Sequence, residues 1–218
     1  MNTIVPRLFR VSLGALLIGA GLGACAPMLV GGAVMTGMSA ADRRTMGAQI
    51  EDERIETRGG GRIAEHLGER VRINITSYNR QVLLTGEVPS EQDKQLAEQV
   101  VARVENVRTI INELAVMGMA TLGQRSSDAL VTGRVKSNLI DARDLNSSAY
   151  KVVTERGTVY LLGRVTLRES DRAADLARRT SGVQKVVKLF EIISEEDLWE
   201  MQRQAEPAAK KQEQSASY

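Results

Sequence analysis

The chain has 218 residues with 29 basic and 27 acidic side chains, and only 3% of its residues are aromatic. Two of the arginines, Arg7 and Arg10, lie in an N-terminal leader, so the rest of the chain carries 27 charges of each sign. A net charge near zero argues against general nucleic-acid binding, which needs a basic surface. The scarcity of aromatic residues also argues against platforms that stack bases.

The first 24 residues have the pattern of a secretory signal, in which the two arginines precede an apolar run from Val11 to Leu22. The Leu-Gly-Ala-Cys tetrad ending at Cys25 resembles the bacterial lipobox, whose cysteine is acylated after the preceding peptide is removed. Cys25 is therefore the predicted lipidation site, and several acyl chains give a stable anchor. The alternatives are an ordinary signal peptide or a short transmembrane helix, although the apolar run is too short to span a bilayer.

Two strands of the same pattern lie 77 residues apart, because Val82 to Val88 and Val159 to Val165 both end in Gly-x-Val. Each follows a shorter strand and a tight turn, which predicts a hairpin, and each precedes a segment with helical spacing and a β-branched strand. The shorter strands are expected over 72–76 and 150–154, the helices over 91–104 and 168–180, and the last strands over 107–116 and 183–193. The sequence thus predicts two copies ordered helix, strand, strand, helix, strand.

The repeated Val-x-Leu-x-Gly-x-Val strand, the Ala-rich helix and the Gly-Val-x-x-Val-Val motif at 182–187 resemble the BON domain. Two such domains behind a lipobox are similar to the dual-BON outer-membrane lipoproteins of Gram-negative bacteria. The resemblance implies an α+β fold with two tandem αββαβ sandwiches, no enzymatic activity, and contact with anionic phospholipid through the second copy. It implies a signal peptide, a flexible tether, two domains separated by a linker, and a short helix with a disordered tail, over 1–24, 25–48, 49–116, 117–127, 128–193 and 194–218.

The first helix of the first copy is expected between Glu51 and Leu67, but Gly59, Gly60 and Gly61 fall within it. Each glycine costs about 1 kcal/mol relative to alanine in a helix interior. The sequence therefore predicts a helix that is short, broken or shifted. Either the first copy has lost a surface that the second retains, or the glycines form a loop without functional consequence.

Catalytic and metal-binding constellations are absent from the sequence. His66 is the only histidine and Cys25 is blocked by acylation, so no Cys-His dyad, serine-histidine triad or histidine-based zinc site can form. Carboxylate pairs such as Asp141 with Asp144 are typical of solvated surfaces. We therefore expect neither a catalytic residue, a metal site nor a cofactor.

The candidate site lies on the helix expected from about Asp128 to Ala142. Its core stripe is predicted to contain Val131, Val135, Leu139 and Ala142. Leu130, Arg134, Ser137 and Ile140 fall largely outside that stripe, and apolar residues beside an arginine suit a lipid interface. The copies also differ in charge, with nine basic and twelve acidic residues over 49–116 but twelve basic and eight acidic over 128–193. The alternative is that Leu130 and Ile140 merely widen the core stripe.

The last predicted helix starts at Ser194, where Asp197 three residues later suggests a capping box. Trp199, the only tryptophan, is expected to dock this helix on a domain, the alternative being insertion at a membrane interface.

Taken together, these patterns predict a periplasm-facing lipoprotein of the outer membrane that binds anionic phospholipid through its second domain and supports envelope integrity. Ala26 follows Cys25, and an aspartate there would be the retention signal of many inner-membrane lipoproteins. The alternative is a non-catalytic adaptor that binds envelope-assembly or division proteins and uses lipid only as a tether.

Overall fold

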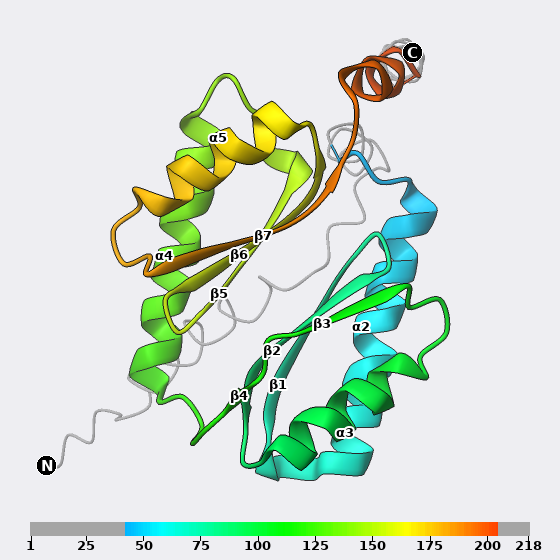
Figure 1. Cartoon of the computed structure of the whole chain (residues 1–218), viewed down its shortest axis with the longest axis vertical. Helices are drawn as coiled ribbons and strands as arrows, with labels where there is room; N and C mark the ends of the chain where they lie inside the picture. The colour runs from blue at the N-terminus through cyan, green and yellow to red at the C-terminus, as the bar shows by residue number, and fades with distance from the viewer. Residues whose placement is uncertain (1–41, 205–218) are drawn as a thin grey trace, which may run out of the picture.

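The computed structural model describes residues 42–204 and arranges them as two domains of the same architecture (Figure 1). The first domain contains α2 (Met46–Leu67), η1 (Gly68–Arg70), β1 (Arg72–Tyr78), β2 (Gln81–Val88), α3 (Glu91–Ala102), β3 (Thr109–Asn112) and β4 (Ala115–Val116). The second contains α4 (Leu122–Asp141), η2 (Ser147–Ala149), β5 (Tyr150–Glu155), β6 (Thr158–Val165), α5 (Leu167–Arg178) and β7 (Lys185–Ile192). The predicted α+β class and the αββαβ order of both copies are confirmed.

Each domain is a small mixed sheet with two helices on one face (Figure 1). In the first sheet, β2 pairs antiparallel with β1 and parallel with both β3 and β4. In the second, β6 pairs antiparallel with β5 and parallel with β7. The central strands β2 and β6 are therefore the repeated Gly-x-Val strands of the sequence, and they are buried along almost their whole length.

A buried aspartate near the start of each first helix holds the hairpin turn of its own domain. Asp52 accepts hydrogen bonds from the backbone amides of Asn79 and Arg80 at 2.7 and 2.8 Å. Asp128 does the same for Arg156 and Gly157 at 2.8 and 2.9 Å. All four turn residues have positive φ angles, as two-residue hairpin turns require. These aspartates are equivalent in the repeat, and the sequence pattern did not single them out.

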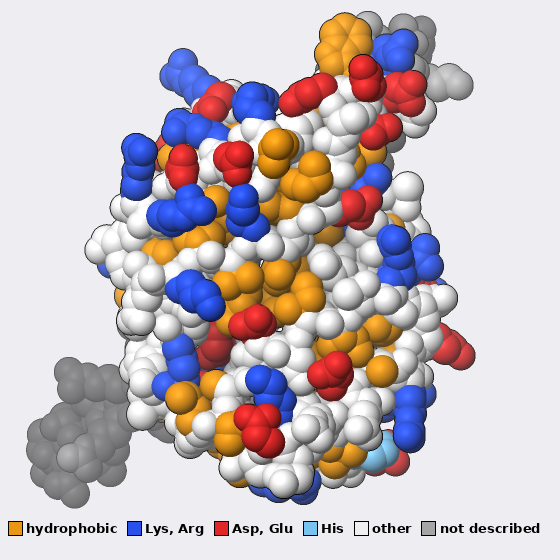
Figure 2. Space-filling model, in the orientation of Figure 1, with side chains coloured by type: hydrophobic (Ala, Val, Ile, Leu, Met, Phe, Trp, Pro, Cys, Tyr) orange, Lys and Arg blue, Asp and Glu red, His pale blue; other side chains and the backbone are white. Residues whose placement is uncertain are grey.

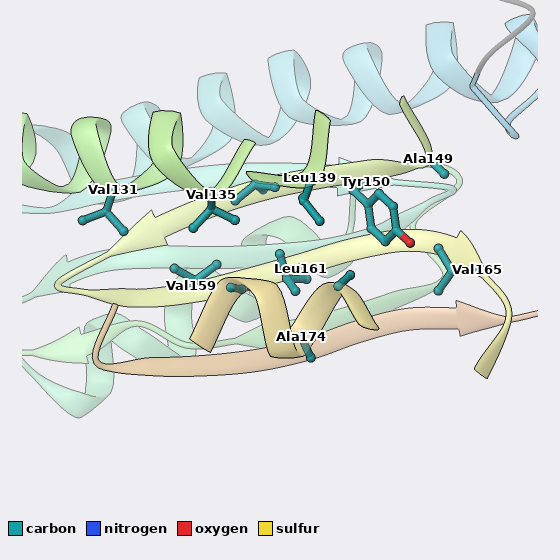
Figure 3. Close-up of a cluster of buried hydrophobic side chains, with 12 residues drawn as sticks. Val131, Val135, Leu139, Ala149, Tyr150, Val159, Leu161, Val165 and Ala174 are labelled. Atoms are coloured by element: carbon teal, nitrogen blue, oxygen red, sulfur yellow. The ribbon is translucent and has the colours of Figure 1, made fainter. Parts of the chain in front are cut away.

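Each domain has its own apolar core between sheet and helices. In the second domain, Val131, Val135 and Leu139 of α4 point toward the sheet, where they meet side chains of β5, β6 and α5 (Figure 3). The predicted stripe of α4 is therefore confirmed, and Ala142 at its end is buried as well.

Gly86 and Gly163 are required by close backbone contact at equivalent positions of β2 and β6. A Cβ on Gly163 would lie 2.4 Å from the carbonyl oxygen of Ala149, and one on Gly86 would lie 2.0 Å from that of Arg72. Neither obstacle can rotate away, since both are backbone atoms. This explains why the repeated strand motif contains glycine in both copies.

The expectation of a broken first helix is wrong, because α2 runs without interruption from Met46 to Leu67 through all three glycines. Gly59 is buried, and a Cβ there would approach the Cδ1 atom of Ile75 to 2.9 Å. Gly60 and Gly61 face open space. The packing of α2 on β1 thus outweighs the low helix propensity of glycine, as tertiary contacts commonly do.

Two further features differ from expectation, and a third agrees with it. The last strand of the first copy is split into β3 and β4, which leaves Glu113 and Leu114 between them. The capping box at Ser194 is present, with the Asp197 amide donating to Ser194 Oγ at 3.0 Å. Trp199, however, does not dock this helix on a domain, because Trp199 is 66% exposed. The neighbouring Leu198 is buried instead.

The two sheets pack against each other through the faces that carry no helices. Tyr78 and Leu83 of the first domain and Tyr160 and Leu162 of the second form a shared apolar cluster. Each domain therefore buries its helix-free face against the other domain rather than exposing it to water.

Charged pairs surround this shared cluster. Arg72 pairs with Glu87 of its own domain at 2.8 Å and also with Glu155 of the second domain. Arg156 reaches back to Glu87 at 2.9 Å. Burial would raise the pKa of Glu87, but hydrogen bonds from Arg72, the Ala120 amide and Arg156 hold it below its ordinary value. For Glu155 burial prevails, and its pKa is raised.

The residues just before α2 also join the domains. Arg43 donates to both carboxylate oxygens of Glu169 at 2.7 and 2.8 Å and to the carbonyl oxygen of Arg164 at 2.9 Å. Arg44 pairs with Asp52 and lies over the Tyr78 ring, 4.3 Å from its centroid. The segment expected as the end of a tether over 25–48 is thus packed on both domains from Asp42, and α2 begins at Met46.

Candidate lipid-binding face of α4

Helix α4 begins six residues earlier than the sequence indicates, inside the segment expected as a linker over 117–127. Thr121 is its N-cap and forms a capping box with Gln124, which satisfies two free amides of the first turn. The helix is 20 residues long, so it presents a surface of about 30 Å at 1.5 Å per residue.

The outward face of α4 carries large apolar side chains. Leu130 is 61% exposed and Ile140 is 66% exposed, and Arg134 and Ser137 between them are also exposed. The alternative that Leu130 and Ile140 widen the core stripe is therefore wrong. Leu122, which is 73% exposed, lies near the start of the same helix; sequence reasoning missed it because the helix was expected to begin later.

Arg134 is held in place by the loop between α5 and β7. Its guanidinium donates to the carbonyl oxygen of Ser181 at 3.3 Å. The loop can approach α4 because Gly182 has no side chain: a Cβ there would lie 2.7 Å from Val131. One turn further on, Asn138 donates to the hydroxyl of Thr180 at 2.8 Å. Arg134 thus stays on the helix surface with other donors free for an incoming anion.

Other cations lie along or just beyond α4. Arg125, Lys136 and Arg143 are exposed, and within residues 42–204 none of them has an ion-pair partner. Of the two acidic residues on α4, Asp128 is buried and occupied by the hairpin turn, which leaves Asp141. The electrostatic character of this face is therefore positive.

A shallow hollow of about 130 Å³ adjoins Ile140, with Lys136, Ser147 and Ser148 on its rim and Tyr150 and Val152 among its apolar lining. Burial raises the pKa of Tyr150 further above its ordinary value, so its hydroxyl remains a neutral phenol. The hollow places hydroxyl groups and an ammonium beside an exposed apolar side chain, a combination that suits an amphiphilic ligand.

The equivalent positions of α2 lack these features. Through the alignment of Asp52 with Asp128, Leu130 corresponds to Arg54 and Ile140 to Ala64. The arginine equivalent to Arg134 is Arg58, whose guanidinium pairs with Glu105 at 2.7 Å. Of the two helices, only α4 thus combines exposed apolar side chains with a cation outside an ion pair at these positions.

Cys25, the predicted lipidation site, lies outside the described residues. Across residues 42–204, no helix has both the length and the apolar character needed to cross a bilayer. The same part of the chain contains no group of three or more His, Cys, Asp or Glu side chains arranged to hold a metal ion.

Comparison with known proteins agrees with this architecture. The BON domain family model matches residues 51–118 and 127–194, which is most of both domains. The chain is therefore a protein with two BON domains.

Two curated relatives narrow the family further. The chain is 36% identical over 183 residues to outer membrane lipoprotein DolP of Haemophilus influenzae, covering 82% of this chain and 95% of that protein. It is 34% identical over 154 residues to the 21 kDa hemolysin of Actinobacillus pleuropneumoniae, covering 70% of this chain and 79% of that protein. The chain belongs to the outer-membrane lipoproteins with two BON domains.

A solved structure of the C-terminal domain of CdsD, a type III secretion protein of Chlamydia trachomatis, overlaps 63% of this chain and 96% of its own. The sequence identity is 12% and the TM-score is 0.28, and this structural similarity is too low to bear on the fold.

Proposed function

We propose that the outward face of α4 binds anionic phospholipid in the membrane to which Cys25 anchors the chain, and that this contact supports envelope integrity without catalysis. The observation that carries the proposal is the exposure of Leu130 and Ile140 on a helix whose neighbouring cations lack carboxylate partners. Apolar side chains enter the headgroup region, while the cations meet phosphate.

The magnitudes indicate a weak contact that needs the anchor. Full burial of a Leu or Ile side chain is worth about 1.5–3 kcal/mol, and each near-surface cation adds about 1 kcal/mol. Because α4 would enter only the headgroup region of the bilayer, its side chains would be partly buried. The binding free energy of the helix is therefore a fraction of the sum of these values. An acyl anchor on the same chain raises the effective concentration of membrane and turns this weak contact into a stable orientation.

The chain leading from Cys25 would bring the second domain close to the bilayer. Sixteen residues separate Cys25 from Asp42, so the two residues lie at most about 60 Å apart, the limit set by about 3.6 Å per residue of chain. The next residue, Arg43, is paired with Glu169 of the second domain. The anchored end of the chain therefore arrives at the domain that carries α4.

Co-sedimentation of the unacylated chain from Ala26 onward with vesicles tests the proposal. We expect binding to vesicles that contain phosphatidylglycerol, weaker binding to pure phosphatidylcholine, and a loss of binding as salt rises, because screened cations contribute less. Leu130→Glu and Ile140→Glu should each reduce binding severalfold. The melting temperature should stay within about 2 °C of the wild type, since exposed substitutions cost within about 0.5 kcal/mol.

Ile50→Glu is the matched control, since Ile50 is an exposed apolar residue of α2, 47% accessible. It should leave vesicle binding unchanged. Equal binding to neutral and anionic vesicles at low salt would contradict the electrostatic part of the proposal. Equal losses in Ile50→Glu and Leu130→Glu would contradict its assignment to α4.

The anchor is tested separately with Cys25→Ser. We expect the variant to be unacylated and retained unprocessed or mislocalised, with no change in the fold of residues 42–204. A mature wild-type N-terminus located elsewhere and free of lipid, as measured by mass spectrometry, would refute lipidation at Cys25.

A further inference from the structure

The interface between the two stacked sheets has two long sides, and they are built differently. On one side the edge strands β1 and β5 lie together, and on the other side β3 lies across from β7. We refer to the second side as the β3–β7 groove, lined by Thr109, Ile111 and Glu113 from the first domain and Lys185, Val187, Leu189 and Glu191 from the second.

Polar pairs close the β1–β5 side. Asn74 and Arg72 both bond to Glu155, and the Lys151 ammonium donates to the carbonyl oxygen of Ser77 at 3.1 Å and to Glu56 at 2.7 Å. These contacts span the side from one end to the other. Among the described residues, Val153 is the one partly buried apolar residue that packs against the shared cluster from this side, compared with three from the other side.

The β3–β7 groove has such pairs only toward its ends. Asn79 donates to Glu191 at 2.6 Å at one end, and Tyr160 donates to Glu113 at 3.3 Å at the other. Between them Ile111, Val187 and Leu189 are only partly buried against the shared cluster. Figure 2 shows this as a patch of hydrophobic side chains in the middle of the face, between the two domains.

A hollow opens at each end of this apolar row. One has a volume of about 200 Å³ and is lined by Thr109 and Arg108 on one side and Phe190 and Glu191 on the other. The second, about 380 Å³, lies between the β3–β4 connection and Lys185. The groove thus follows the length of β7, which has eight residues and spans about 26 Å at 3.3 Å per residue.

Both strands that border the groove are sheet edges. Within the described residues, β7 pairs only with β6 and β3 only with β2. An edge strand presents unpaired backbone amides and carbonyls, which an extended peptide can satisfy by adding a strand. Alternate side chains of that peptide would then point into the groove and cover the apolar row, because successive side chains of a strand face opposite ways.

The charges at the groove indicate the chemistry of the peptide. Lys185 at one end and Arg108 at the other are exposed, and neither side chain has an ion-pair partner within residues 42–204. A third cation, Lys94, lines the larger hollow and is also unpaired in the same part of the chain. Glu191 and Glu113 also line the groove, but Glu191 pairs with Arg164 at 3.1 Å and Glu113 accepts from the Tyr160 hydroxyl at 3.3 Å. Acidic residues flanking an apolar core would still find a cation outside an ion pair at each end.

We propose that the β3–β7 groove binds an extended peptide segment of another protein, about eight residues long, with alternating apolar side chains and acidic residues at both ends. The protein's own segment over 26–41 does not meet this description, because it contains no acidic residue. The groove is distinct from the α4 face, and a partner seated in it would leave α4 free for the membrane.

The probe is a fluorescein-labelled peptide of about eight residues, with a core of alternating valines and threonines and one aspartate at each end. We expect it to bind the unacylated chain from Ala26 onward at least tenfold more tightly than the same core flanked by lysines. Amide hydrogen exchange should slow in β7 or β3 on binding, because an added strand bonds directly to the edge backbone. The α4 amides should not change.

The double variant Lys185→Glu with Arg108→Glu should bind the aspartate-flanked peptide at least tenfold more weakly than the wild type does. It should bind the lysine-flanked peptide more tightly. Arg62→Glu, an exposed charge reversal on α2, is the matched control and should change neither. Because all three residues are exposed, the melting temperatures serve to confirm that each variant is folded.

Several outcomes would overturn the proposal: equal binding of the two peptides, edge amides that exchange at an unchanged rate, or no effect of the double charge reversal. Tighter binding of a synthetic peptide with the 26–41 sequence would identify the groove as a site for the chain's own tether. Competition between anionic vesicles and the peptide would identify it as a lipid site, and concentration-dependent dimerisation that excludes the peptide would assign it to a second copy.

Discussion

The first helices of the two domains, α2 and α4, share an inward face and differ on the outward one. In both, an aspartate holds the hairpin turn, and the buried positions that follow fall at the same spacing. On the outward face, Leu130 and Ile140 of α4 stand where α2 has Arg54 and Ala64. The two helices thus share their buried positions, which packing against the sheet constrains. Their exposed positions differ, because packing does not constrain them.

The same contrast extends to the glycines of the two helices. Gly59 of α2 is buried against Ile75, whereas Gly133 of α4 is exposed and has no neighbouring atom within 4 Å of a Cβ position. Residues that look alike in sequence therefore differ in what the fold requires of them. The predictions that follow separate the shared scaffold from the features that each domain has acquired.

The largest effect is expected where the two domains are most alike. Gly86→Val and Gly163→Val should each lower the free energy of unfolding by about 4 kcal/mol, in the range of the most damaging single substitutions. The cause is a clash of the new Cβ with a backbone carbonyl. Urea denaturation measures the change, and Gly133→Val on the exposed face of α4 should change it little. A mild effect at only one of the two glycines would show that the domains are not equivalent there.

Removing the link between the domains should have the next largest effect. Arg72→Met leaves Glu87 with Arg156 as its remaining cation and Glu155 with none, which should cost about 2–3 kcal/mol because buried charges lose a partner. Adding Glu155→Gln should recover part of this loss, since the double variant no longer buries an uncompensated carboxylate. If the double variant is less stable than Arg72→Met alone, the pairing described for Glu155 is wrong.

A smaller effect, dependent on pH, is expected at Glu169, which the first domain reaches through Arg43. Burial would raise the pKa of Glu169, but hydrogen bonds from Arg43 and the Thr166 amide hold it below the ordinary 4.5. A carboxyl group with a lowered pKa stabilises the fold above its unfolded pKa, and this contribution disappears as pH falls through the folded value.

Glu169→Gln should therefore cost about 1.5–2 kcal/mol at pH 7, the lower part of the range for hydrogen bonds to a charged group. The difference from wild type should narrow at pH 3, because that pH lies below the ordinary pKa of 4.5 and part of the stabilisation by the ionised form is lost there. Melting temperatures at the two pH values check this, and a difference that is the same at both would contradict the role of the ionised form.

The smallest effect concerns the glycine run of α2. Gly60→Ala and Gly61→Ala should each stabilise the protein by about 0.5–1 kcal/mol, because both face open space in a helix interior. Gly59→Ala should stabilise the protein less than either of these substitutions, since the Cδ1 atom of Ile75 must move to make room for the new Cβ. Equal gains at all three positions would mean that α2 is not packed on β1 as described.

Much of the fold could be predicted from the sequence because its signals are local. The β-branched strands, the Gly-x-Val repeat and the apolar stripe of α4 reflect periods of two and 3.6 residues, which depend on burial of one face. The stripe of Val131, Val135 and Leu139 also made Leu130 and Ile140 candidates for the outward face, but a wider core stripe was the alternative, and only the structure showed that both side chains are exposed. Leu122 was missed because an N-cap at Thr121 is a weaker signal than the periodicity that begins later.

What the sequence determined by itself was the set of elements, the duplication and the family, since each depends on residues close together in the chain. What only the tertiary structure decided depends on residues far apart. The continuity of α2 through three glycines is set by its packing on β1, and the pairing of Arg43 with Glu169 joins residues 126 positions apart. The stacking of the two helix-free faces closes one side of the interface with Glu155 and leaves the other as the β3–β7 groove. No local pattern encodes that asymmetry, because it arises only when two complete sheets meet.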